Sequence, residues 1–301
     1  MPIRRVLVSP SSAKHQANWP ASTWLLFAGS LLGLAAFLYP FILPSLLRAI
    51  GTPARLPGVE GPLVLAGVAL CCVFLLVTRF AAARQLTANP AKTAALLGAI
   101  VALDASLRLV PSLGGATSIF LLIILVGAVF GAELGFLTGA LTLFLSAFLT
   151  GGVGPWLPFQ MLGAGWVGLG AAWLPRGHRG YPHLVSLILY GIGGGFLYGA
   201  LLSLYSWPFA SPGLAESSTL FWHPGLGPRD TIHRFASFYL VTSFSHDALR
   251  AIGNGLLLLT LGPPLVRTLE RGRRRLSWRQ PQGLPALATS SPVIDVQRGH
   301  S

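Results

Sequence analysis

Long apolar segments constrain the fold of this chain more than any other feature. A helix that spans a bilayer needs about 20 mostly apolar residues. Eight segments near that length follow one another, separated by polar residues, Gly or Pro: Trp24–Leu47, Pro62–Thr78, Thr93–Val110, Ser118–Ala132, Leu134–Leu149, Pro158–Leu174, His183–Ser206 and His233–Val266. The last is long enough to include an amphipathic outer stretch. The pattern predicts an all-α, polytopic membrane protein.

Composition supports a lipid environment. Of the 301 residues, 53% are hydrophobic and 10% are charged, whereas soluble domains carry roughly 25% charged residues. The alternating pattern that a β-sandwich or barrel requires is absent from the sequence. The two cysteines, Cys71 and Cys72, are adjacent within an apolar run. We therefore interpret them as small buried side chains rather than as a disulfide or a metal site.

Basic residues give the chain a formal net charge of +13, and their distribution indicates its orientation. With both termini inside, 15 Lys and Arg residues lie on the inner side, 5 lie on the outer side, and Arg250 lies within the last span. Such an excess marks the cytoplasmic side. We predict a plasma-membrane protein with both termini cytoplasmic, a basic arm at 1–22 and a disordered tail at 279–301. The juxtamembrane arginines from Arg267 to Arg275 favour contact with the lipid bilayer rather than with nucleic acid.

An acid and a base lie near the outer end of the third segment. Ionisable groups at membrane depth are costly unless they are paired or face a wet cavity. Asp104 and Arg108 are four residues apart on one helix face, so we expect them to pair. Such a pair either stabilises the helix end or lines the mouth of a binding cavity.

A polar stripe marks the last segment. His246, Asp247 and Arg250 are followed by Asn254, at spacings that keep Asp247, Arg250 and Asn254 on one face of an otherwise apolar helix. The stripe should face the interior of the bundle. Its role is either helix–helix hydrogen bonding or contact with a ligand.

Enzyme signatures are missing from the sequence. It contains no HExxH, P-loop or GxSxG motif, and its seven histidines lack metal-ligand spacing. We predict no catalytic residue, metal or cofactor. One alternative is an intramembrane aspartyl hydrolase in which Asp104 and Asp247 share a proton. Each aspartate, however, has an arginine on its own helix face, which favours two ionised carboxylates. A stand-alone secondary transporter is a second alternative, but the inverted repeats typical of that class are not evident.

A ladder of small residues runs along the third segment. Two series are spaced by four residues: Ala91, Ala95 and Ala99, and Ala94, Gly98 and Ala102. Small residues at this spacing let helix backbones approach closely. The ladder serves either packing inside the bundle or docking of a partner membrane protein.

Three motifs in order along the chain resemble one family. The first is GAVFGAELGF at Gly127–Phe136, followed by Gly139. The second is LTGGVGPWLPFQM at Leu149–Met161, followed by a Gly/Ala-rich run, and the third is DALRAIGN at Asp247–Asn254. Together they resemble the substrate-binding S components of energy-coupling-factor (ECF) transporters, vitamin-importing relatives of ABC transporters. The similarity covers roughly residues 91–275.

The resemblance implies a six-helix core at 85–278, preceded by two additional transmembrane helices at 23–84. It further implies a non-catalytic subunit that captures a vitamin-like micronutrient, either cobalamin-like or another heterocycle, from outside. Such a subunit docks through its small-residue face, here Ala91, Ala95, Gly98, Ala99 and Ala102, on a membrane T component driven by two cytoplasmic ATPases.

Aromatic residues near the predicted outer surface complete the expected site. Trp156, Phe159 and Gln160 offer an aromatic platform and an amide to a flat, polar heterocycle, although such aromatics also anchor helices in headgroups. A second group beside the outer connection is placed to close over a ligand: Tyr205, Trp207, Phe221 and Trp222. The expected substrate-binding set is Trp156, Phe159, Gln160, Asp104, Arg108, Asp247, Arg250, Asn254 and Trp222.

Overall fold

The structure, a computed structural model, describes residues 21–51, 60–85, 90–109, 118–175, 181–210, 219–223 and 225–276. Within these ranges the regular elements are all helical. They are α1 (Ala21–Ala49), α2 (Glu60–Gln85), α3 (Pro90–Leu107), α4 (Ile119–Phe130), α5 (Ala132–Thr150), α6 (Leu157–Gly170), the 3-10 turn η2 (Ala171–Trp173), α7 (Tyr181–Ser206), the 3-10 turn η3 (Trp207–Phe209), α8 (Pro228–Thr242), α9 (Phe244–Thr260) and α10 (Gly262–Leu276). The all-α class is confirmed. The predicted tail at 279–301 lies outside the described residues, as does the basic arm apart from its last two residues.

Among the described helices, three are long and apolar enough to cross a membrane: Ala21–Pro44, Ala132–Thr150 and Tyr181–Phe209. The pair of α9 and α10 also qualifies if it is taken as one span, although it is bent by 64°. Leu63–Leu75 and Ile119–Phe130 are shorter apolar helices. The chain is therefore a multi-pass membrane protein, and the count of eight spans stays a prediction.

The extent of the last predicted span, His233–Val266, is wrong. Three helices cover this stretch, with breaks at Ser243 and at Leu261. Ser243 has a non-helical backbone, and Gly262 begins α10 just before two prolines, which lack the N–H that a continuous helix needs. The amphipathic outer stretch expected there is α8.

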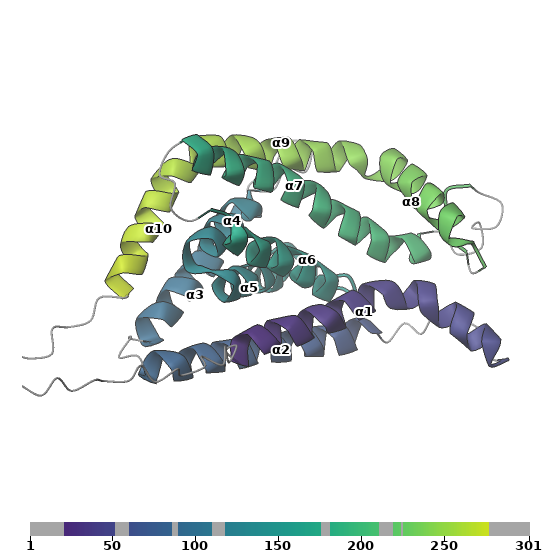
Figure 1. Cartoon of the computed structure of the whole chain (residues 1–301), viewed down its shortest axis with the longest axis horizontal. Helices are drawn as coiled ribbons and strands as arrows, with labels where there is room; N and C mark the ends of the chain where they lie inside the picture. The colour runs from purple at the N-terminus through teal and green to yellow at the C-terminus, as the bar shows by residue number, and fades with distance from the viewer. Residues whose placement is uncertain are drawn as a thin grey trace, which may run out of the picture.

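Helices α4, α5 and α6 form the centre of the molecule, between a layer of α7 with α9 and a layer of α1 with α2 (Figure 1). Glycines bring the central backbones into direct contact. A Cβ atom on Gly135 would lie 2.2 Å from the carbonyl oxygen of Gly168, and one on Gly139 would lie 2.3 Å from that of Ala164. Gly131, with φ of 101°, makes the tight turn between α4 and α5. The glycine motif at 127–139 is thus a packing surface.

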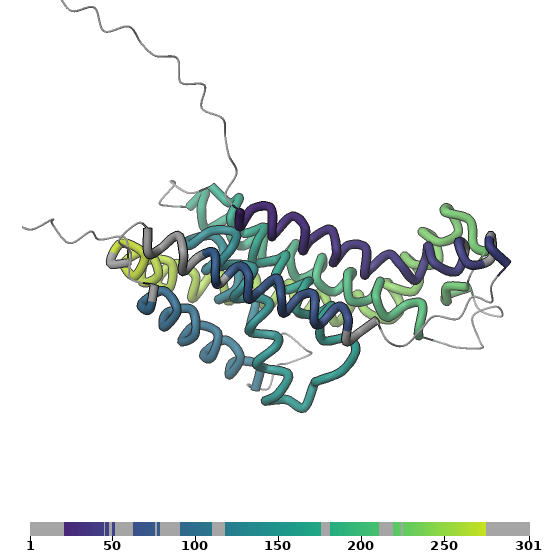
Figure 2. The backbone as a smooth tube through the Cα atoms, turned by 90° about the horizontal axis from the view of Figure 1, so that it is seen from below, coloured from purple at the N-terminus to yellow at the C-terminus, as the bar shows by residue number. Residues whose placement is uncertain are grey.

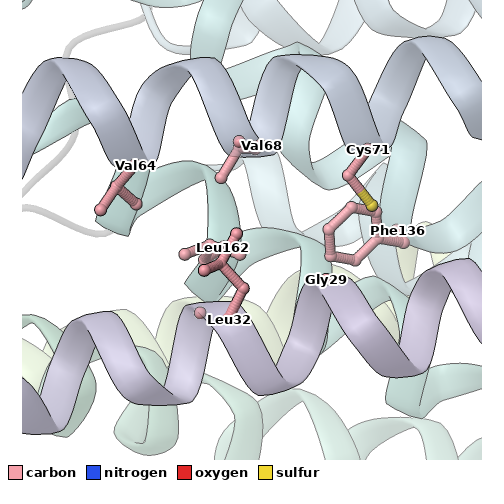
Figure 3. Close-up of a pocket in the computed structure, with 9 residues that line it drawn as sticks. Gly29, Leu32, Val64, Val68, Cys71, Phe136 and Leu162 are labelled. Carbon is pink, nitrogen blue, oxygen red and sulfur yellow. The ribbon is translucent and has the colours of Figure 1, made fainter.

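The two leading helices pack against this centre and are not a separate unit. Figure 2 shows α1 and α2 running side by side along it. Between them, backed by Phe136 and Leu162, lies an apolar crevice that includes Cys71 (Figure 3). It leaves about 10 Å³ for a water-sized molecule, far below the roughly 300–1,000 Å³ of a small-molecule site. The crevice is a packing gap, and both cysteines are free, as expected.

Candidate functional site

A buried polar cluster forms where α9 faces α7. Arg250 donates from Nη1 to Asp247 Oδ1, and its Nη2 lies 3.1 Å from His246 Nδ1. Tyr239 on α8 donates to Asp247 Oδ2 at 2.9 Å. Asp247 and Arg250 are only 2% and 8% exposed, so the charge pair replaces the solvation that both groups lose. The predicted polar stripe on this helix does face the interior.

Two adjacent residues of α7 complete the cluster. The Tyr198 ring lies beneath the Arg250 guanidinium, 5.3 Å from its carbon, in a cation–π arrangement. Gly199 lies directly against the Asp247 carboxylate, because a Cβ atom at this position would fall 1.7 Å from Oδ2. The glycine at 199 therefore makes room for the aspartate.

Asn254 continues the stripe one turn further along α9. It is 1% exposed, and its Nδ2 donates to the carbonyl of Gly191 at 3.2 Å. Its Oδ1 is buried without a hydrogen-bond donor among the described residues. The amide nitrogen of Asn254 thus joins α9 to α7, and its amide oxygen is left as an acceptor without a hydrogen bond.

The surroundings of Tyr239 raise the pKa of its hydroxyl further above physiological pH. This residue lies on α8, outside the helices that are long and apolar enough to span. Desolvation, followed by the hydrogen bond to Asp247, raises the pKa of Tyr239 to about 12. The hydroxyl therefore remains a donor to Asp247 throughout the physiological pH range.

The predicted pair of Asp104 with Arg108 is wrong. Asp104 is fully buried, and neither carboxylate oxygen has a hydrogen-bond donor among the described residues. The polar group beside it is Thr142 of α5. Arg108 instead donates to Ser146 at 2.9 Å, because α3 ends there and the side chain turns toward α5. The two residues therefore make separate contacts with α5.

The hypothesis of an aspartyl dyad finds no support in this geometry. Asp247 is held by Arg250 and Tyr239, and no hydrogen bond joins it to Asp104. The helix that carries Asp104 packs on α5, whereas α9 packs on α7. A carboxylate pair that shares a proton requires direct contact.

An aromatic cluster lies about two turns further along α7 from Tyr198. Phe159 on α6 is fully buried and stacks on Tyr205, with ring centroids 3.9 Å apart. Trp207 in η3 and Trp222 in the following segment are also buried, and Trp207 donates from Nε1 to the carbonyl of Leu220. Phe159 and Tyr205 therefore stack on each other, whereas Trp207 and Trp222 belong to a second aromatic cluster.

Helix α1 contributes one aromatic residue to each of these two clusters. Phe37 packs edge-on against Phe159 at 5.0 Å, and Phe41 packs edge-on against Trp222 at 5.4 Å. The sequence did not single out Phe37, Phe41, Tyr198 or Tyr239. A tyrosine beside a glycine in a Gly-rich run was a signal for Tyr198, whereas no local pattern distinguishes Phe37 from lipid-facing aromatics.

Trp156 and Gln160 differ in their surroundings. Trp156 is 45% exposed, and its indole folds back to donate to the carbonyl of Gly152 at 3.1 Å. This fold requires Gly154, where a Cβ atom would meet the indole at 2.4 Å. Gln160 is half-buried, and its Oε1 is buried without a donor among the described residues. Gln160 therefore offers an unused acceptor.

The small-residue ladder of α3 faces outward. Ala91, Ala95, Gly98, Ala99 and Ala102 are all exposed. A Cβ atom on Gly98 would meet nothing within 4 Å. The opposite face of α3, with Leu97 and Val101, is the one that packs on the bundle. Within the described part of the chain, these five residues are therefore not used for packing, whereas Ala94 of the same ladder is half-buried.

Comparison with known proteins identifies the family. The sequence model of the family described as "ECF transporter, substrate-specific component" matches residues 92–262, which is 171 of the 301 residues. Comparison with curated proteins and with solved structures yields no match. Because the match covers more than half of the chain, the protein belongs to the substrate-specific components of ECF transporters, which are membrane-embedded, substrate-binding and non-catalytic subunits.

Proposed function

We propose that the chain captures a vitamin-like heterocycle, cobalamin-like or of another kind, at the outer face of the plasma membrane. A T component and two cytoplasmic ATPases then drive its import. The proposed substrate site extends along α7 and draws on the two aromatic clusters, the polar cluster and the end of α3: Trp156, Phe159, Gln160, Asp104, Arg108, Asp247, Arg250, Asn254 and Trp222.

The observation that carries this proposal is the set of buried acceptors without donors. Within the described residues these include Gln160 Oε1 and Asn254 Oδ1. Leaving a buried acceptor unsatisfied costs about 1–3 kcal/mol. A heterocycle that carries N–H or O–H donors would recover part of that free energy, while its flat ring would pack beside Phe159 and Tyr205.

The outward ladder on α3 supports the proposed partner. Because Ala95 and Ala99 have small side chains, a helix of a partner membrane protein can approach the α3 backbone closely at these positions. The packing of helices within a membrane depends on such close approach. The ladder has no partner within the described part of the chain, and in this proposal the T component covers it.

Purification and reconstitution test the proposal. We expect a small heterocycle to co-purify with the protein, detected by mass spectrometry, and we expect vesicles that contain the chain, the T component and the ATPases to import it only with ATP. The Gln160→Leu variant should no longer co-purify with the compound. The Ser106→Ala variant should retain it, because this exposed hydroxyl donates to the carbonyl of Ala102 on its own helix. Import driven by an ion gradient without ATP would instead favour a secondary transporter.

A further inference from the structure

Helix α1 lies outside the region that matches the family, yet its aromatic residues touch the residues of the proposed site. Phe37 and Phe41 contact Phe159 and Trp222 directly. Phe37 also lies 5.6 Å from the ring of Trp166. Each of the two aromatic clusters is therefore shared between α1 and the family core.

The position of α1 is fixed by close contacts with α6. Trp166 donates from Nε1 to Ser30 Oγ at 3.1 Å. One turn further along α1, a Cβ atom on Gly33 would fall 2.9 Å from the Trp166 ring and 3.0 Å from Leu162. Phe37 follows Gly33 by four residues on the same face. This hydrogen bond and close approach direct Phe37 at Phe159.

The same helix has a second, different face. Trp24, Phe27, Leu31, Leu38 and Ile42 are exposed, as expected of side chains that meet lipid. Phe37, by contrast, is 1% exposed, and Pro40 and Pro44 are buried on its side of the helix. The helix changes direction in its C-terminal half and runs toward the end of the molecule where α7 ends and α8 begins (Figure 1).

We propose that α1 forms one wall of the substrate site and that Phe37 and Phe41 are specificity-determining residues. Their rings would contact the planar part of the substrate and limit the size of ring system that fits against Phe159 and Trp222. This inference rests on the proposed function. It assigns the additional N-terminal helices to substrate selection.

The test compares aromatic residues on the two faces of α1. Full-length protein in lipid nanodiscs is titrated calorimetrically with cyanocobalamin, a bulky probe, and with riboflavin, a smaller planar one. For the probe that the wild type binds, Phe37→Ala and Phe41→Ala should each lower the affinity by about tenfold. They should also change the ratio of the affinities for the two probes. Phe27→Ala, the matched control at a position 57% exposed, should leave both affinities within about twofold.

The outcomes separate this inference from the proposed function. If Phe37→Ala and Phe41→Ala bind both probes like Phe27→Ala, α1 is not a wall of the site, although the capture function stands. If the wild type binds neither probe, the substrate is neither a corrinoid nor a flavin, and the assignment of α1 to selection between these ring systems fails. Phe37→Leu retains most of the packing. A changed affinity ratio in this variant, at an unchanged melting temperature, separates substrate contact from loss of stability.

Discussion

Gly199 is the position at which the polar cluster tolerates a side chain least. An added Cβ would lie 1.7 Å from Asp247 Oδ2, so Gly199→Ala should displace the carboxylate from Arg250 and destabilise the protein by about 1–3 kcal/mol. Gly193 on the same helix has nothing within 4 Å of its added Cβ. Gly193→Ala should instead be neutral or raise stability by up to about 1 kcal/mol. Thermal unfolding in detergent measures both, and equal melting temperatures would refute the contact.

The Asp247–Arg250 pair should matter more than any single neutral hydrogen bond. Asp247→Asn leaves the Arg250 guanidinium buried without a counter-charge, which costs about 3–5 kcal/mol. Tyr239→Phe removes one donor to the same carboxylate and should cost only about 1 kcal/mol. Denaturant titrations of the two variants test this order. A loss from Tyr239→Phe as large as that from Asp247→Asn would mean that the hydroxyl, and not the arginine, stabilises the aspartate.

Helix α3 presents two faces with different roles, and its outward face makes a prediction about assembly. The double substitution Ala95→Leu with Ala99→Leu should prevent close approach of a partner helix and abolish co-purification with the T component. Binding of the substrate should be retained. Ala66→Leu with Ala69→Leu adds the same bulk to exposed positions of α2 and should leave the complex intact. Loss of substrate binding with the complex retained would contradict the assignment of this face.

Most helices were predictable from the sequence because the signals are local. Apolar length places α1, α5 and α7, and the glycine motif places the turn at Gly131. The predicted last span is too long because apolar residues continue across the breaks at Ser243 and Leu261. The partner of Arg108 was missed for a different reason. Asp104 is the nearest acid in sequence, whereas Ser146 comes close only after α3 and α5 have packed.

The candidate site was only partly predictable for the same reason. Polar residues inside apolar segments stand out in a sequence, so the positions of Asp247, Arg250 and Asn254 were found. The sequence does not show which face of an apolar helix an aromatic residue occupies. In α1, for example, Phe27 is exposed and Phe37 is buried. The choice between lipid and interior depends on the contacts of Gly33 and Ser30 with α6.

The molecule as a whole has two ends that should face opposite sides of the membrane. Arg273 on α10 donates to the carbonyl of Val129 at 2.9 Å, which places the basic helix at the α4–α5 turn. The 19 residues of α5 extend about 28 Å, nearly the thickness of the hydrocarbon core. Val153, beyond the far end of α5, therefore belongs to the opposite surface.

Cysteine labelling tests this orientation in intact cells. In a background with Cys71 and Cys72 replaced by Ser, Val153→Cys should react with a membrane-impermeant maleimide added outside. Arg271→Cys should react only after permeabilisation, because the excess of basic residues predicts that this side faces the cytoplasm. Both positions are exposed on the protein. A cysteine that does not react with the maleimide is therefore shielded by the membrane and not by burial in the protein. The reverse pattern would turn the proposed site toward the cytoplasm, and a subunit so oriented could not capture a solute from outside.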